Sequence, residues 1–161
     1  MKKLLFPLLV CLSLCSCHSY KNEITSFDMK NYHNDIDLVL STSERAKSPS
    51  KFTLNSYYVK DNDGFIYTIQ IVYKDVEIKN IKAIMLPNDL EDYKESILPC
   101  IGYTDALTLS EKRDVSKNQY SGFNLSYKTD KDNLSFDFFV RDEANDEYNI
   151  YAVSSFTLLE E

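Results

Sequence analysis

The chain has 161 residues, a formal net charge of −7, 12 tyrosines and no tryptophan. This length suits one domain with a real hydrophobic core. The acidic balance disfavours DNA, RNA and anionic lipid headgroups as partners, so no nucleic-acid function is expected.

The N-terminal segment has the pattern of an export signal. Lys2 and Lys3 precede an apolar run over residues 4–14, which small residues follow. As a helix, this run would span roughly 16 Å, well short of a hydrocarbon core of about 30 Å. We therefore predict that residues 1–16 are a signal peptide that is removed, and not a transmembrane helix.

The end of this segment resembles the lipobox of bacterial lipoprotein precursors. Leu14-Cys15-Ser16-Cys17 has an apolar residue, two small residues and a cysteine. The resemblance implies cleavage before Cys17, a diacylglycerol on its sulfur and an acylated amine, and two or more acyl chains anchor a protein almost permanently. We expect a lipid-anchored protein of the bacterial cell envelope, on the outer membrane or the cell surface. The alternative is an ordinary secretory signal cleaved near Ser16.

Cysteine usage follows from this assignment. Cys11 and Cys15 would leave with the signal and Cys17 would carry lipid, so Cys100 alone would remain free. The folded domain is then expected to lack an internal disulfide. The apolar neighbours of Cys100 favour a buried, inert thiol over a reactive one.

Residues 17–25 are predicted to be a lipidated tether, and residues 26–161 a single globular domain. Ser26 or Asp28 is a candidate cap for a first helix. Apolar residues then recur at three- and four-residue spacing, as expected for one helical face: Met29, Tyr32, Ile36, Val39 and Leu40. A competing interpretation makes residues 36–40 a first strand.

From residue 52 onward the apolar period is two. Strands are predicted over 52–58, 65–73, 76–86, 106–109, 123–127, 134–140 and 148–158, with a short helix over 88–97. Turns are predicted at 60–64, 130–133 and 142–147, the first because Asp-Gly is a strong hairpin signal. The interval between Phe138 and Tyr148 resembles the last hairpin of bacterial immunoglobulin-like domains.

These elements predict a mainly β fold. We expect an antiparallel β-sandwich, immunoglobulin-like or similar, with one or two short helices and a meander of about seven strands. The alternative is an α+β fold in which a helix packs on a meander sheet.

Catalytic and metal-binding residues are scarce. A histidine-based triad would have to use His33, since His18 lies beside the lipid, and no nucleophile elbow occurs. Residues 61–64 fail as part of an EF-hand loop, while 142–147 is either a calcium-binding turn or a solvated hairpin tip. We assign no catalytic residue, no metal site and no cofactor.

Three aromatic residues lie off the main apolar face of their strands: Tyr57, Phe139 and Tyr151. Either they form an exposed patch that binds a ligand, or their strands are buried on both faces. We favour burial because a helix is available as cover, but the three remain the candidate binding patch.

Three classes of function stay open. The first, to which we commit, is a non-catalytic binding or accessory module for an envelope protein or a glycan. The second is a structural or assembly subunit, or an inhibitor of an exported enzyme, which a long unpaired edge at residues 148–158 would favour. The third is an enzyme of unidentified class, which a cleft with His33 beside carboxylates or Cys100 would favour.

Overall fold

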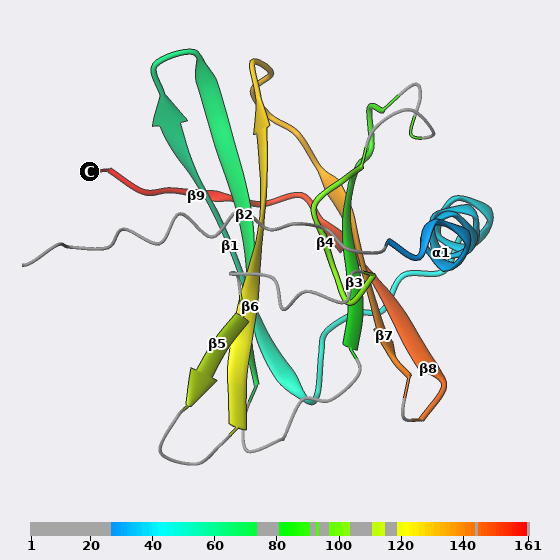
Figure 1. Cartoon of the computed structure of the whole chain (residues 1–161). Coiled ribbons are helices and arrows are strands. Elements are labelled where there is room, and N and C mark those ends of the chain that lie inside the picture. The colour runs from blue at the N-terminus through cyan, green and yellow to red at the C-terminus, as the bar shows by residue number, and fades with distance from the viewer. Residues whose placement is uncertain are drawn as a thin grey trace, which may run out of the picture.

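The computed structural model describes residues 27–73, 81–90, 93, 97–103, 111–114, 119–143 and 145–160. Two β-sheets pack face to face, and one helix covers the outer face of the smaller sheet (Figure 1). The prediction of a mainly β sandwich with a short helix is confirmed. The α+β alternative was right in one respect, since the helix does pack on a sheet.

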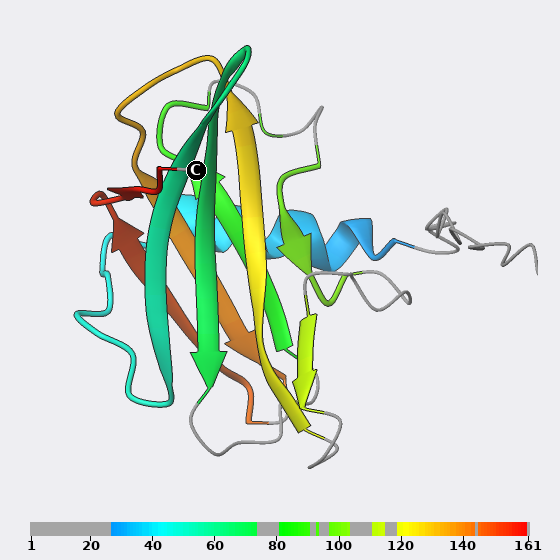
Figure 2. The same ribbon diagram turned by 90° about the vertical axis from the view of Figure 1, so that its left-hand side faces the viewer.

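The larger sheet contains β5 (Glu111–Asp114), β6 (Gln119–Thr129), β2 (Gly64–Tyr73), β1 (Phe52–Asp61) and β9 (Thr157–Leu158), in that spatial order. The smaller sheet contains β4 (Cys100–Ile101), β3 (Ile81–Pro87), β7 (Phe136–Asp142) and β8 (Glu147–Val153). Figure 2 looks onto the larger sheet, with the helix running behind both sheets and across the strands.

The strand order is that of an immunoglobulin sandwich. In such a fold strands A, B, E and D form one sheet and C, F and G form the other. Here β1, β2, β6 and β5 follow the first order, and β3, β7 and β8 the second. The predicted meander is wrong, because the chain changes sheet between β2 and β3 and again between β6 and β7. Period-two patterning identifies strands but does not say which strands pair.

The main core lies between the two sheets. It is built from the inward residues of each strand, as the alternation predicts: Phe52, Tyr67, Ile69, Ile71, Ala83, Met85, Ile101, Phe123, Leu125, Leu134, Phe136, Phe138, Val140, Tyr151 and Val153. The opposite faces of β3, β7 and β8 are also apolar, and these strands are therefore buried on both sides.

The helix α1 (Met29–Ser41) supplies the cover for that second face. Asp28 caps it by accepting a hydrogen bond from the Asn31 amide, so the second of the two predicted caps is the correct one. Tyr32, Ile36 and Val39 pack against the smaller sheet and are almost fully buried. The predicted periodicity is confirmed for these three, whereas Met29 and Leu40 lie at the edge of the face and stay exposed.

Two ion pairs hold the helix and the segment after it against β7, and β7 supplies the cation of one pair and the anion of the other. The buried Asp35 accepts from Arg141 Nη2 at 2.6 Å and from the Tyr103 hydroxyl at 2.7 Å. In the opposite sense, Arg45 makes a bidentate pair with Asp137, at 2.7 and 2.6 Å. Burial, together with the hydrogen bond to Asp35, raises the pKa of Tyr103, so this hydroxyl stays a donor.

The C-terminal part differs from the predicted single strand over 148–158. β8 ends at Val153, and the chain crosses to the other sheet, where β9 pairs in parallel with Tyr57 and Tyr58 of β1. The outer edge of β8 is partly covered, because the Ala46 amide donates to the Ile150 carbonyl at 2.7 Å. The edge that would favour strand addition is therefore shorter than residues 148–158, and one of its carbonyls is already occupied.

Several predictions concern residues outside the described ranges. These are the signal over 1–16, the tether over 17–25, the strand over 106–109, and much of the helix over 88–97. The start of the predicted strand over 76–86 is outside as well, and its described part is β3. Within the described residues, no helix combines the length and the apolar character needed to cross a membrane.

We predict that Asp35→Ala lowers the free energy of unfolding by about 3 kcal/mol, because Arg141 and Tyr103 lose their shared partner beneath the helix. The value lies at the low end for a buried pair, since the Arg141 side chain is 24% exposed. Chemical denaturation of the purified variant measures it. Asn34→Ala, at an exposed position of the same helix, is the matched control and should change stability by less than about 0.5 kcal/mol. Equal effects of the two substitutions would contradict the anchoring role of Asp35.

Candidate functional site

The three residues of the candidate binding patch do not lie together on one exposed surface. Phe139 is fully buried beneath α1, while Tyr151 is 6% exposed and belongs to the core between the sheets. The two therefore face opposite sides of the smaller sheet. Tyr57 is half-buried on β1 of the other sheet. The favoured prediction of strands buried on both faces accounts for Phe139 and Tyr151, because α1 and the larger sheet cover one face each.

A second core lies between α1 and the outer face of the smaller sheet, and both His33 and Cys100 lie beside it. The His33 ring lies 5.6 Å from that of Tyr32, and its buried Nε2 has no hydrogen-bond partner among the described residues. Cys100, on β4, is half-buried and packs against the core beneath α1. Burial raises the pKa of its thiol to about 12, as expected for an inert cysteine.

The carboxylates of the turn between β7 and β8 are engaged in ion pairs. Glu143 lies 2.6 Å from Lys82, Asp146 lies 3.4 Å from Arg141, and Glu147 lies 3.2 Å from Lys51. These contacts tie the turn to neighbouring residues. Among the residues that the structure describes, no group of three histidine, cysteine or acidic side chains could hold a metal ion.

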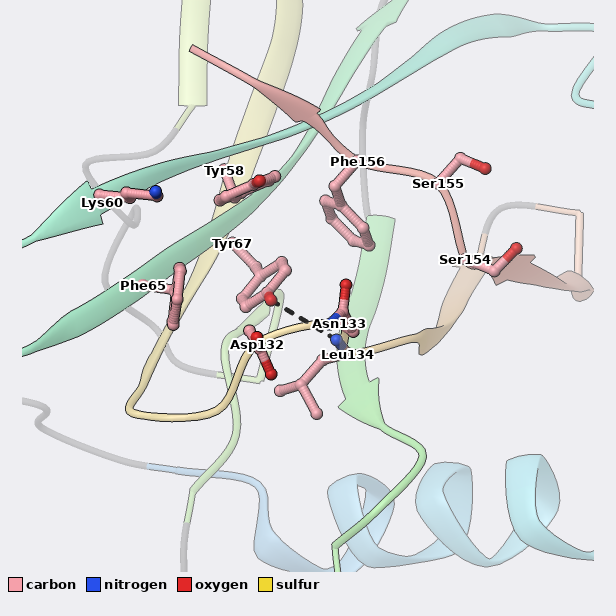
Figure 3. Close-up of a pocket in the computed structure, with 10 residues that line it drawn as sticks. All are labelled: Tyr58, Lys60, Phe65, Tyr67, Asp132, Asn133, Leu134, Ser154, Ser155 and Phe156. Carbon is pink, nitrogen blue, oxygen red and sulfur yellow. Dashed lines mark hydrogen bonds between the residues drawn. The ribbon is translucent and has the colours of Figure 1, made fainter. Parts of the chain in front are cut away.

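A pocket of about 430 Å³ opens at one end of the sandwich, beside the tip of the β1–β2 hairpin (Figure 3). Three segments form it: the hairpin, the loop between β6 and β7, and the crossing between β8 and β9. Its volume falls in the range of small-molecule sites, about 300–1,000 Å³. The pocket is the candidate functional site.

Aromatic rings form the inner wall of the pocket. Tyr58 and Tyr67 are stacked, with centroids 5.5 Å apart and an angle of 28° between planes. Phe65 meets Tyr58 at 6.0 Å and 60°, and Phe156 meets Tyr67 edge-on at 5.1 Å and 85°. Tyr67 is buried, but the other three keep partial access to solvent. Apolar ring surface is therefore left uncovered inside a concave site.

Strand alternation explains why three of these rings converge. Tyr58 and Tyr67 are directly opposite in the antiparallel register, as are Lys60 and Phe65. Residues two apart on a strand share a face, so all four point toward the space between the sheets. Phe156 comes from the far end of the chain and closes the other side.

The rim of the pocket is polar. Lys60, Asp132 and Asn133 are exposed there, and none makes a side-chain hydrogen bond or ion pair with any other described residue. In Figure 3 the hydroxyl groups of Ser154 and Ser155 point away from the rings. The pocket therefore offers a ligand one ammonium, one carboxylate and one amide at its rim, in addition to the hydroxyl of Tyr58 in its wall.

The loop that carries Asp132 and Asn133 is held in place. The Asn88 amide donates to the Ser135 carbonyl at 3.0 Å, and Lys131 pairs with Asp89 at 2.7 Å. The Leu134 amide approaches the Tyr67 hydroxyl at 3.5 Å, which links the loop to the aromatic wall. Asn133 has a φ of 55°, a left-handed conformation that asparagine accepts more readily than most residues.

Gly64 permits the close packing of the hairpin against β6. A Cβ at this position would collide with the Thr129 carbonyl, and its φ of 151° is strained for other residues. The hairpin tip and the β6–β7 loop can therefore approach each other and form two sides of the pocket.

The sequence predicted strands over 52–58 and 65–73, which carry Tyr58, Phe65 and Tyr67, but it did not predict the pocket. Tyr58, Phe65 and Tyr67 have the same alternation as fully buried residues. The one available signal was the aromatic density next to the Asp-Gly turn, where strands end and a sandwich opens. The position of Phe156 had no such signal, since the crossing after β8 is a tertiary feature.

Comparisons with known proteins give no relative from which to infer a function. No family model matches the chain, and neither the curated proteins nor the solved structures include a match.

We predict that the Cys100 thiol in the native protein reacts with iodoacetamide at pH 8 at least about a hundredfold more slowly than in the urea-unfolded protein. The reason is that burial suppresses its thiolate, and the thiolate is the reactive form. Mass spectrometry over time measures the rate. Cys100→Ser should remain folded with a modest loss of stability. Equal rates in the native and unfolded protein would contradict the assignment of an inert thiol.

Proposed function

We propose that this protein is a lipid-anchored lipoprotein of the bacterial cell envelope, and that it acts as a non-catalytic binding module for an envelope protein or a glycan. The ligand enters the pocket beside the β1–β2 hairpin. The lipid on Cys17 holds the module at the membrane surface. The enzyme alternative gains no support from His33 and Cys100 among the described residues, because Cys100 packs in the core beneath α1 and His33 lies against Tyr32 of the same core.

The observation that carries this proposal is the combination of uncovered rings and unengaged polar groups in one pocket. Covering apolar surface contributes about 25 cal/mol per Å² to binding. Lys60, Asp132 and Asn133 can then fix the orientation of the ligand. Aromatic surface combined with a few polar groups that fix orientation is common in small-ligand sites.

The lipid anchor is supported by the sequence of the N-terminal segment. A tethered module does not need high affinity for one isolated ligand, because confinement to a surface raises the effective concentration of neighbouring sites. A single modest pocket is compatible with function in that setting.

A second candidate function is assembly by strand addition, and the observation that favours it is the outer edge of β1. β9 pairs with only two of its ten residues, Tyr57 and Tyr58. Along the rest of that edge no other described strand is paired with β1. An added strand could hydrogen-bond there, as in other cases of β-augmentation.

We predict that Cys17→Ala moves the protein from the membrane fraction to the soluble fraction of lysed cells, because the acyl chains have no other acceptor. Ultracentrifugation and immunoblotting measure the distribution. The matched control is Cys15→Ala, which keeps small residues before Cys17 and should stay with the membrane. A Cys17→Ala variant that still sediments with membranes would disprove lipidation at this residue.

Site-specific photocrosslinking in intact cells tests the binding site. A photoreactive residue is placed at Asn133 on the pocket rim, at Thr53 on the open β1 edge, or at Asn34 on the exposed side of α1. We expect adducts from position 133 and none from position 34, because the ligand occupies the pocket. Adducts from position 53 alone would favour assembly through the β1 edge. The same adducts from all three positions, or none at all, would contradict the proposed binding module.

A further inference from the structure

We propose that the pocket takes a neutral saccharide, with one sugar ring lying against Tyr58 and Phe65. This inference builds on the proposed function and narrows its ligand from protein or glycan to one chemical class. Three features of the pocket support it: the shape of the aromatic wall, the kind of polar groups on the rim, and their net charge.

The aromatic wall suits a ring with an apolar face. Tyr58 and Phe65 meet at 60° and form a corner whose two surfaces are both partly exposed. The axial C–H groups of a pyranose form a flat, weakly positive face, and the face of an aromatic ring is negative. A sugar ring in this corner can stack on one of the two aromatic rings while its edge contacts the other.

The rim groups suit the edge of a sugar. Each sugar hydroxyl is both a donor and an acceptor of hydrogen bonds. Asp132 supplies acceptors, Lys60 supplies donors, and the Asn133 amide supplies both. Hydrogen bonds to charged groups are the stronger ones, and these three side chains have no other partner among the described residues.

The charges of the rim argue against an ionic ligand. Lys60 and Asp132 cancel, so the pocket is locally neutral although the whole chain carries −7. A phosphate or carboxylate would meet one cation beside one anion, and a cationic ligand would meet the same pair in reverse. A neutral polyol can use both groups and leaves no charge uncompensated.

The pocket is also preformed. Ring contacts hold Tyr58, Phe65 and Tyr67 against one another, and hydrogen bonds hold the loop with Asp132 and Asn133. The aromatic wall and the loop backbone therefore need not rearrange when a ligand enters, and the entropy lost is that of the rim side chains. The buried Tyr67 forms the back of the site, and Phe156 limits its depth on the side of the β8–β9 crossing (Figure 3).

The test uses the full-length lipidated protein in detergent micelles, applied to an array of neutral, amino and anionic glycans. We expect signal from neutral glucose- or N-acetylglucosamine-containing oligosaccharides. Isothermal titration with the strongest neutral oligosaccharide then gives a dissociation constant for the variants. Signal confined to anionic or amino glycans, or no signal, would overturn the inference.

Four variants assign the binding to this pocket. Tyr58→Ala should weaken it about tenfold, while Tyr58→Phe, which keeps the ring, should stay within about threefold of the parent. Asp132→Asn, at an exposed loop position where folding is not at risk, should weaken binding about tenfold. Tyr148→Ala removes an exposed tyrosine that stacks on Phe139 outside the pocket, and it should leave affinity unchanged. Equal affinity of Asp132→Asn and the parent, with Tyr58→Ala also unchanged, would place the sugar elsewhere and overturn the inference.

The photocrosslinking experiment separates this inference from the proposed function. A protein adduct at position 133, without any response to neutral glycans, would overturn the saccharide assignment and leave the binding module intact. N-acetyltyrosine amide, which mimics an aromatic side chain of a protein partner, is the matching small probe in the titration. Its binding in place of a saccharide leads to the same conclusion.

Discussion

The smaller sheet has two apolar faces, and the rest of the structure depends on how the second face is covered. Hydrophobic burial alone would let α1 lie on that face in several orientations, because apolar contact has no direction. The outward side of β7 carries Asp137, Phe139 and Arg141, with opposite charges flanking an aromatic residue. Asp35 and Arg45 match these charges in reverse order. This pairing selects one orientation of the helix, since the inverted one would place like charges together.

The same constraint shapes the other end of the molecule. With α1 on one face of the smaller sheet, the larger sheet must cover the opposite face. The sandwich is then open only where strands end and loops begin. Between β8 and β9 the chain crosses this opening and brings Phe156 to the rings of the β1–β2 hairpin. The pocket therefore arises from an ordinary sandwich end with one extra crossing, and its wall continues the main core.

The pocket suits a binding function because its aromatic wall is rigid. Its rings are part of the core, so their positions are fixed by the packing that stabilises the fold. Two of its polar groups, Asp132 and Asn133, lie on one short loop that is tied to the end of β3, and the third, Lys60, lies on β1. The division resembles that of many binding proteins, in which a rigid scaffold positions a few loop residues. The proposed lipid anchor would hold the domain at a membrane surface, so the folded part would not have to span the membrane.

The sequence by itself determined the class of fold, the helix face, the hairpin turns at residues 60–64 and 142–147, and the turn at 130–133 that leads from one sheet to the other. These features are local, since they depend on spacing along one element and on turn residues. It also predicted the export signal, which lies outside the described residues. Only the tertiary structure decided which strands pair, that residues 148–158 divide between two sheets, and that Phe139 and Tyr151 are buried on opposite faces. It alone placed Tyr58, Phe65 and Phe156 at one opening, because residues about 100 positions apart meet only where the chain crosses after β8 and β9 pairs with β1. Alternation tells an inward side chain from an outward one, but it does not tell a closed core from a pocket.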